Sequence, residues 1–244
     1  SSKEAFLPFL DYFSGRYRVT AFDFCGFGQS APLTSPFSVS DYAAWTGEAF
    51  RLLGIEKPYC IAHSFGCRVA VKMQAIAPFG KEIFDKIIFT GPAGLLPRRT
   101  WKYRLKVKAY RAVKKWFPAL AERKFGSEEY RSLSPVMKES YKKIVNEDLR
   151  GDIAKFSPRA LVIEGTEDTV TTAAEAEEYA AILPRGGLKY IKGGHFAFAG
   201  KQGQEADAVA FLYRTVMLHT GYFENGGEEV LYHQIMVAFG FCGY

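Results

Sequence analysis

Short runs of strand-forming residues alternate with helical patterns along most of the chain. Strand-like runs cover residues 16–24, 59–63, 86–90, 160–164 and 188–192. Apolar residues recur at helical spacing over 6–13, 39–53, 175–183 and 205–218, and a further helix-compatible run begins directly after residue 64. Alternation at this interval is typical of a mainly parallel sheet that is covered by helices on both faces. We therefore predict an α/β fold.

The helix over 39–53 has the most complete signals. Ser38 and Asp41 have the spacing of a capping box, and Gly54 predicts the end of the helix. Its apolar positions follow the 3.6-residue period at Val39, Tyr42, Ala43, Thr46, Ala49, Phe50 and Leu53.

The pattern changes between residues 97 and 155, where no strand signal occurs and the run over 98–117 is both strongly basic and amphipathic. We predict an α/β core formed by residues 1–96 and 156–219, a helical cap inserted at 97–155, and a tail at 220–244. The tail has no assignable role and could form a helix, an interface or a mistranslated end. The basic run favours a solvated outer face, with attraction to a membrane surface or to acidic substrates as the alternative.

Composition narrows the function classes. The net charge of +6 comes mostly from the cap, which argues against nucleic acid as a partner. The four cysteines show no paired or metal-ligand spacing, which fits reduced thiols in the cytoplasm, and no histidine pair predicts a metal site. The chain contains no apolar run of about 18 residues that would span a bilayer, although a leader preceding Ser1 would not be visible.

The stretch YCIAHSFGCRVA, residues 59–70, predicts a serine on a tight turn between a strand and a helix. Small residues flank Ser64 in the form A-x-S-x-G, as the close backbone packing of a nucleophile elbow requires. Such a turn lifts the hydroxyl above the sheet and places the backbone N–H of Phe65 at a helix start, where it can face an oxyanion.

Two later loops carry the partners that a serine nucleophile needs. EGTEDTV follows one strand and offers Glu164, Glu167 or Asp168 as the acid, while GGHF follows the last strand and offers His195. We favour Asp168, because it lies furthest into the turn and Glu164 still belongs to the strand. A histidine activates the serine and a carboxylate orients the histidine, so these groups should meet at one edge of the sheet. His63 is expected to pack within the scaffold.

Taken together, DFCGFGQS (23–30), AHSFG (62–66), EGTEDTVT (164–171) and GGHFAF (193–198) resemble the motifs of the α/β-hydrolase superfamily, within it small bacterial hydrolases with a helical cap. The resemblance implies a cofactor-free catalytic triad of Ser64, Asp168 and His195, with Phe65 N–H as an oxyanion donor. A serine nucleophile implies acyl chemistry on a small ester, thioester or amide. We expect the cap with Phe196 and Phe198 to form an apolar pocket for the acyl substrate.

Two features depart from the family pattern. Its first strands and the loop that gives the second oxyanion N–H should precede Ser1, so we expect a truncated chain whose sheet lacks the strand beside the elbow strand. Losing one oxyanion donor costs on the order of 10²–10³ in rate. The alternatives to a hydrolase are a non-catalytic ligand-binding protein and a serine-dependent acyltransferase or C–C bond hydrolase. The sequence makes no prediction of the oligomeric state.

Overall fold

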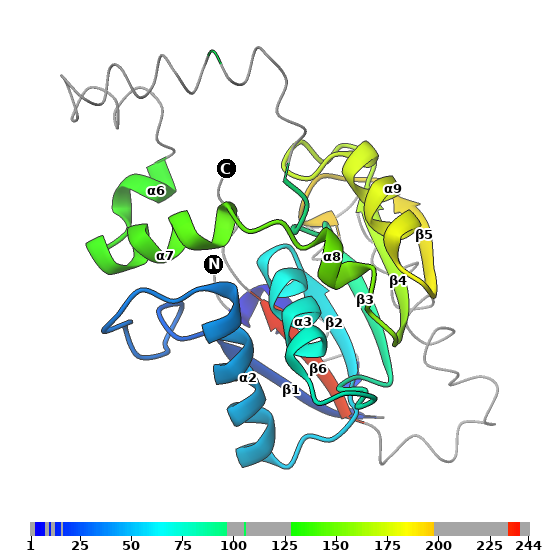
Figure 1. Ribbon diagram of the computed structural model, residues 1–244, viewed down its shortest axis with the longest axis horizontal. Coiled ribbons are helices and arrows are strands. Elements are labelled where there is room, and N and C mark those ends of the chain that lie inside the picture. Colours follow the sequence, from blue (N-terminus) through cyan, green and yellow to red (C-terminus); the bar gives the residue numbers. More distant parts are fainter. Residues whose placement is uncertain are drawn as a thin grey trace.

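The fold is built on a parallel β-sheet (Figure 1). A computed structural model describes residues 3–7, 10, 13–15, 17–96, 105, 128–197 and 234–239. Within these residues the sheet has the order β1-β6-β2-β3-β4-β5, and every neighbouring pair of strands is parallel. The strands are β1 (Arg18–Asp23), β2 (Tyr59–His63), β3 (Lys86–Thr90), β4 (Arg159–Gly165), β5 (Gly186–Ile191) and β6 (Gln234–Phe239). The predicted α/β fold is confirmed.

Among the described residues, four helices form a layer on one face of this sheet, with α2, α3 and α8 in front of the strands in Figure 1. They are α2 (Val39–Leu53), α3 (Phe65–Ile76), α8 (Arg150–Ile153) and α9 (Ala173–Ile182). Contacts run in series from α2 to α3, α8 and α9, while α3 also packs on β2 and α9 on β4 and β5. At the chain's start, the short 3₁₀-helix η1 (Lys3–Phe6) contacts β1.

Helix α2 confirms the prediction from its sequence. The Ser38 hydroxyl accepts from Asp41 N, and the Asp41 carboxylate accepts from Ser38 N at 2.7 Å, which completes the capping box. Gly54 ends the helix with φ of 61°. The predicted stripe is buried at Val39, Tyr42, Ala43, Thr46 and Phe50. Leu53, the last residue of the helix, departs from this stripe and is 44% exposed.

The strand that was expected to be missing from the centre of the sheet is supplied by the end of the chain. Strand β6 pairs with β1 on one side and with β2, which leads into Ser64, on the other. The expectation of a gap beside the elbow strand is therefore wrong for this structure, and so is a helix at 234–239. The error has a physical reason. The hydrogen bonds between two parallel strands do not require the strands to be neighbours in the sequence, so residues 234–239 can pair with β1 and β2.

The described part of the predicted cap is helical, as α6 (Glu128–Ser132), α7 (Pro135–Val145) and α8. Helices α6 and α7 stand away from the sheet on the side of α2 and the N-terminal segment (Figure 1), whereas α8 packs on the core. The basic run over 98–117, apart from residue 105, and the predicted helix at 205–218 lie outside the described residues.

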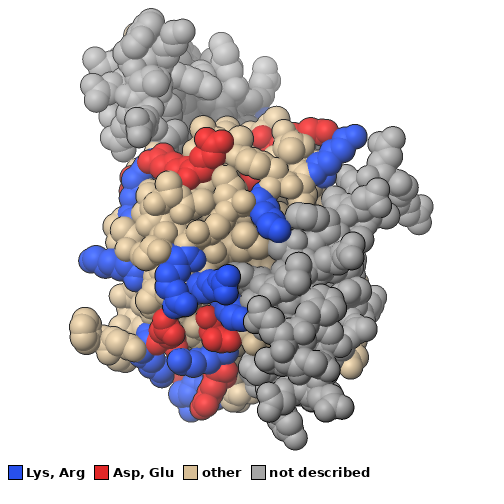
Figure 2. All heavy atoms as spheres, turned by 90° about the vertical axis from the view of Figure 1, so that its right-hand side faces the viewer, with Lys and Arg blue, Asp and Glu red and all other residues tan. Residues whose placement is uncertain are grey.

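Charge on the described surface is mixed in sign. Figure 2 shows lysine and arginine side chains interspersed with aspartate and glutamate over one face, with apolar and neutral surface between them. Mixed charge of this kind creates no single-signed field that would attract a polyanion to the described part of this face.

We predict that Val237→Pro in β6 unfolds the protein or lowers its free energy of unfolding by about 3 kcal/mol or more. Val237 pairs with Ala21 of β1 and with Ile61 of β2, and proline removes the backbone N–H from a strand with neighbours on both sides. Val237→Thr keeps the N–H and β-branching, so it should cost clearly less than the proline variant. Urea unfolding followed by circular dichroism makes the comparison; equal midpoints for the two variants would contradict the central position of β6.

Candidate active site

Ser64 occupies a strained turn between β2 and α3. Its backbone has φ of 49° and ψ of −110°, a conformation that a residue with a side chain rarely adopts. The turn is held because Ser64 N donates to Thr90 O of β3 at 3.0 Å and Ser64 O accepts from Cys67 N at 3.1 Å. All five residues of β2 are buried, so the strand is fixed in the core and ends with the serine at the carboxyl edge of the sheet. Phe65 is the first residue of α3, as an oxyanion donor would have to be.

Asp168 and His195 meet across two loops that leave the neighbouring strands β4 and β5. His195 Nδ1 lies 2.6 Å from Asp168 Oδ2. The other carboxylate oxygen, Oδ1, accepts from Val170 N at 2.7 Å and from Thr171 N at 3.0 Å. The aspartate is therefore fixed by its own turn, and an Nδ1–H donated to it leaves His195 Nε2 as the basic nitrogen of the ring.

Burial opposes ionisation of Asp168, but its hydrogen bonds outweigh that effect. The bond and charge of His195, with the backbone N–H of Val170, lower the pKa of Asp168 to about 2. Asp168 is consequently a carboxylate over the whole range in which an imidazole titrates, which is the state that an orienting acid requires.

Two glycines make room for the histidine loop. A Cβ at Gly91, which has φ of 49°, would lie 2.9 Å from His195 Cε1 and 3.0 Å from Nδ1. At Gly165 a Cβ would lie 2.5 Å from the carbonyl oxygens of both Gly193 and Gly194. Side chains at either position would push His195 away from Asp168. Gly91 also directly follows Thr90, the residue that holds Ser64 N, so the serine turn and the histidine share this support.

His63 lies under the histidine of the pair. Its Nδ1 is 3.0 Å from Thr90 O, its side chain is fully buried, and its ring centroid lies 4.6 Å from that of His195. Burial, with repulsion from His195, keeps the pKa of His63 well below its usual value, so the ring is neutral and packs as part of the scaffold. The prediction placed His63 in the scaffold but missed its contact with His195. Sequence spacing carries no information on which side chains from distant parts of the chain meet.

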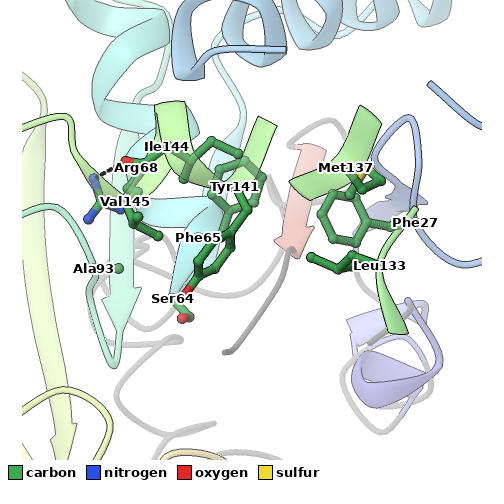
Figure 3. A pocket seen from close by; sticks show the side chains of 10 residues that line it. All are labelled: Phe27, Ser64, Phe65, Arg68, Ala93, Leu133, Met137, Tyr141, Ile144 and Val145. Carbon is green, nitrogen blue, oxygen red and sulfur yellow. Dashed lines mark hydrogen bonds between the residues drawn. The ribbon is translucent and has the colours of Figure 1, made fainter. Parts of the chain in front are cut away.

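A pocket opens beside Ser64, between α3 and the helices α6 and α7 (Figure 3). In Figure 3, Phe65, Tyr141 and Ile144 line one side of the pocket, facing Phe27, Leu133 and Met137 on the other. The lining is mostly apolar and consists of Phe27, Ser64, Phe65, Arg68, Ala93, Leu133, Met137, Tyr141, Ile144 and Val145. The expected contribution of the cap to an apolar pocket is thus present in the geometry.

The two phenylalanines that were predicted for the pocket are not among these residues. Phe196 is 42% exposed and lies against the rings of His63 and His195, at 5.1 and 5.5 Å between centroids. Phe198 lies outside the described residues. The pocket's described aromatic side chains are instead those of Phe27, Phe65 and Tyr141. Phe27 lies in the turn after β1, Phe65 directly follows Ser64, and Tyr141 belongs to α7.

Arg68 connects helix α3 to the C-terminal end of α7 by hydrogen bonds. It projects from α3, is 4% exposed, and its Nη1 donates to Ile144 O at 3.1 Å and to Glu147 O at 2.8 Å. Ile144 lies in the last turn of α7 and Glu147 follows the helix, and a positive charge at this end also complements the helix dipole. Lys72, one turn further along α3, pairs with Glu147 and Asp152 on the same segment.

Among the described residues, no group of three or more histidine, cysteine, aspartate or glutamate side chains is placed to hold a metal ion. Nor does any helix in the described ranges have the length and apolar character needed to cross a bilayer.

Comparison with known proteins agrees with this topology. A family model described as the alpha/beta hydrolase fold matches residues 1–118. An esterase from Exiguobacterium antarcticum superposes with a TM-score of 0.66 over 88% of each chain at 18% identity. This chain has the α/β-hydrolase fold. A hydrolase from Pseudomonas aeruginosa (TM-score 0.62, 22% identity, covering 87% of this chain and 86% of that one) has the same fold.

Two further proteins of stated activity are similar to this α/β-hydrolase-fold chain. The enol-lactonase from Burkholderia xenovorans gives a TM-score of 0.64 at 19% identity, covering 89% of this chain and 87% of that one. By sequence, the (E)-2-((N-methylformamido)methylene)succinate hydrolase of Acinetobacter baylyi is 29% identical over 75 residues. That match spans 31% of this chain and 28% of that enzyme.

We predict that Gly91→Ala separates His195 from Asp168, because the added methyl group would occupy the space of the imidazole. The proton between Nδ1 and the carboxylate should then lose its low-field ¹H NMR signal. Gly80→Ala is the matched control, since Gly80 also has positive φ, at 76°, but no atom lies within 4 Å of its Cβ position. Retention of the signal in the Gly91 variant, or its loss in both, would contradict the close packing described here.

Proposed function

We propose that this protein is a serine hydrolase that cleaves a small ester, thioester or amide through an acyl intermediate on Ser64. The observation that carries the proposal is the 2.6 Å contact of His195 Nδ1 with Asp168, which leaves Nε2 as the base at the edge where Ser64 ends β2. A structural serine would have no need of a strained backbone at the edge of the sheet that also carries an oriented imidazole.

Each group has a defined part in the proposed reaction. His195 Nε2 accepts the proton of Ser64 Oγ as the oxygen attacks the acyl carbon, and Asp168 stabilises the imidazolium that forms. The backbone N–H of Phe65 donates to the oxyanion. His195 then protonates the leaving group, and a water molecule activated by the same imidazole releases the acid from Ser64.

The similar proteins support this class of reaction. Three of them are named as an esterase, an enol-lactonase and a hydrolase of a formamido-substituted succinate. A lactone is a cyclic ester, so two of these names describe cleavage of an ester bond. The substrate proposed here is a small ester or a close acyl analogue.

The pocket supports an apolar acyl group. Aromatic and aliphatic side chains dominate its lining beside Ser64. Among the described lining residues only Arg68 is charged, and it donates to the carbonyls of Ile144 and Glu147. Burying a methylene group in such a pocket contributes about 0.8 kcal/mol, so substrates should be ranked by their apolar acyl portion.

Ser64→Ala should lower p-nitrophenyl ester turnover by about 10⁴-fold or more and abolish labelling by a fluorophosphonate probe. Ser157→Ala is the control, because Ser157 is exposed and precedes β4 at the opposite edge of the sheet. Wild-type protein that binds an ester without turnover or labelling would instead support a non-catalytic ligand-binding protein. Acyl transfer to an alcohol in place of water, detected in the products, would support an acyltransferase.

Met137→Ala should move the preference toward longer acyl chains. Met137 lines the pocket from α7 and is 9% exposed, so truncating it deepens the apolar space. We expect the ratio of kcat/KM for a hexanoyl over an acetyl ester to rise about tenfold, within the range found for added methylenes. Glu139→Ala, an exposed position on the same helix, should leave the ratio within about twofold. An unchanged ratio in the Met137 variant would place the acyl group elsewhere.

A further inference from the structure

The acid of the proposed triad has a second carboxyl group beside it that the reaction does not use. Glu164 lies near the end of β4, pairs with Tyr190 of β5, and is 0% exposed. A fully buried carboxyl group at this place requires a partner for its proton or for its charge.

The hydroxyl of Thr171 connects the two carboxyl groups. Thr171 Oγ1 lies 2.9 Å from Asp168 Oδ2 and 3.3 Å from Glu164 Oε1. A hydroxyl has one proton, so it can donate to only one of the two carboxyl groups. Asp168 is the closer and is ionised, so the hydroxyl donates to Asp168. The contact with Glu164 is then a hydrogen bond only if the glutamate carries the proton and donates to Oγ1.

The surroundings of Glu164 favour the protonated form. Burial, together with the nearby negative charge of Asp168, raises the pKa of Glu164 to about 9. Oε2 meets no hydrogen-bond donor among the described residues. The titratable groups that face it are Asp168 from its own turn, His195 from the loop after β5, with His63 of β2 behind that ring, and Tyr190 from β5.

We propose that Glu164 is a positioning residue that stays a neutral carboxylic acid and, through the hydroxyl of Thr171, holds Asp168 in place for His195. The proposal depends on the triad role proposed above for Asp168, whereas the protonation of Glu164 can be tested without any activity. In this arrangement the two carboxyl groups lie side by side without two negative charges, because one keeps its proton.

Thermal unfolding as a function of pH tests the protonation directly. The folded pKa of Glu164 is raised above its unfolded value, so its stabilising effect is complete below about pH 4.5 and is lost as the pH rises toward about 9. Glu164→Gln lacks this ionisation. The Tm of the wild type relative to Glu164→Gln should therefore fall by at least about 2 °C between pH 5 and pH 9.

Glu167→Gln is the matched control, since Glu167 belongs to the same turn but is exposed. Its Tm difference from the wild type should stay constant over this range. Asp168 does not interfere, because its lowered pKa confines its contribution to stability changes below about pH 4. A difference between wild type and Glu164→Gln that does not change from pH 5 to pH 9 would overturn the proposal.

Enzyme kinetics test the positioning role. Thr171→Val removes the connecting hydroxyl and should lower kcat for a p-nitrophenyl ester about tenfold with little change in KM, while Thr171→Ser restores it. Glu164→Met, which has no donor, should likewise be about tenfold slower than Glu164→Gln, whose amide can donate to Oγ1. The kcat ratio of Glu164→Gln to wild type should also rise above about pH 9. Equal kcat for Thr171→Val and Thr171→Ser would overturn the role.

The two proposals fail in different ways. Full turnover in Ser64→Ala would contradict the proposed serine mechanism, but the pH dependence of unfolding would still test the protonation of Glu164. A Tm difference independent of pH, in a protein that still needs Ser64 for turnover, would remove the role of Glu164 alone.

Discussion

The contact of the His195 imidazole with the Asp168 carboxylate joins loops that leave two neighbouring strands, and the geometry of the site depends on it. Each loop is fixed independently: backbone N–H groups of Val170 and Thr171 hold one carboxylate oxygen, and the glycine run before His195 packs against Gly165. Parallel pairing of β4 with β5 brings their carboxyl ends to one edge, so the two groups meet without either loop being long. The same edge receives Ser64 from β2.

Two carboxyl groups at this edge have opposite protonation states although the same strand and turn carry them. Asp168 accepts hydrogen bonds at both oxygens, including that from the imidazole, and is ionised. Glu164 is fully buried and reaches Oγ1 of Thr171, so burial dominates its pKa. The number of donors around each oxygen, more than the residue type, decides which group is the anion. Because the two groups interact, their protons belong to the pair, and a change at one alters the other.

The sequence predicted those features whose cause is local. Glycine, serine and the capping residues act within a few positions, so the turn at Ser64, the capping box of α2 and the acid turn could be read from neighbouring residues. The choice of Asp168 over Glu164 followed from the same reasoning, because Asp168 lies furthest into the turn and Glu164 belongs to the strand.

Features that depend on distant segments could not be predicted in this way. The ring of His63 under His195 and the aromatic wall supplied by Phe27 arise only when separate loops pack together. The pairing partner of β6 is the clearest case, because hydrophobic alternation in 234–239 predicts neither the neighbours nor the register of a strand.

Because β6 lies between β1 and β2, the sheet of a chain synthesised from its N-terminus can close only after residues 234–239 have been made. Strands β1 and β2 each present an open edge to the other until β6 has left the ribosome and entered between them. Contacts between such distant segments form slowly, and the unpaired edges are meanwhile open to association with other chains. The pairing of β2, which leads into Ser64, is therefore tied to synthesis of residues 234–239, and a chain without these residues would leave one side of β2 unpaired.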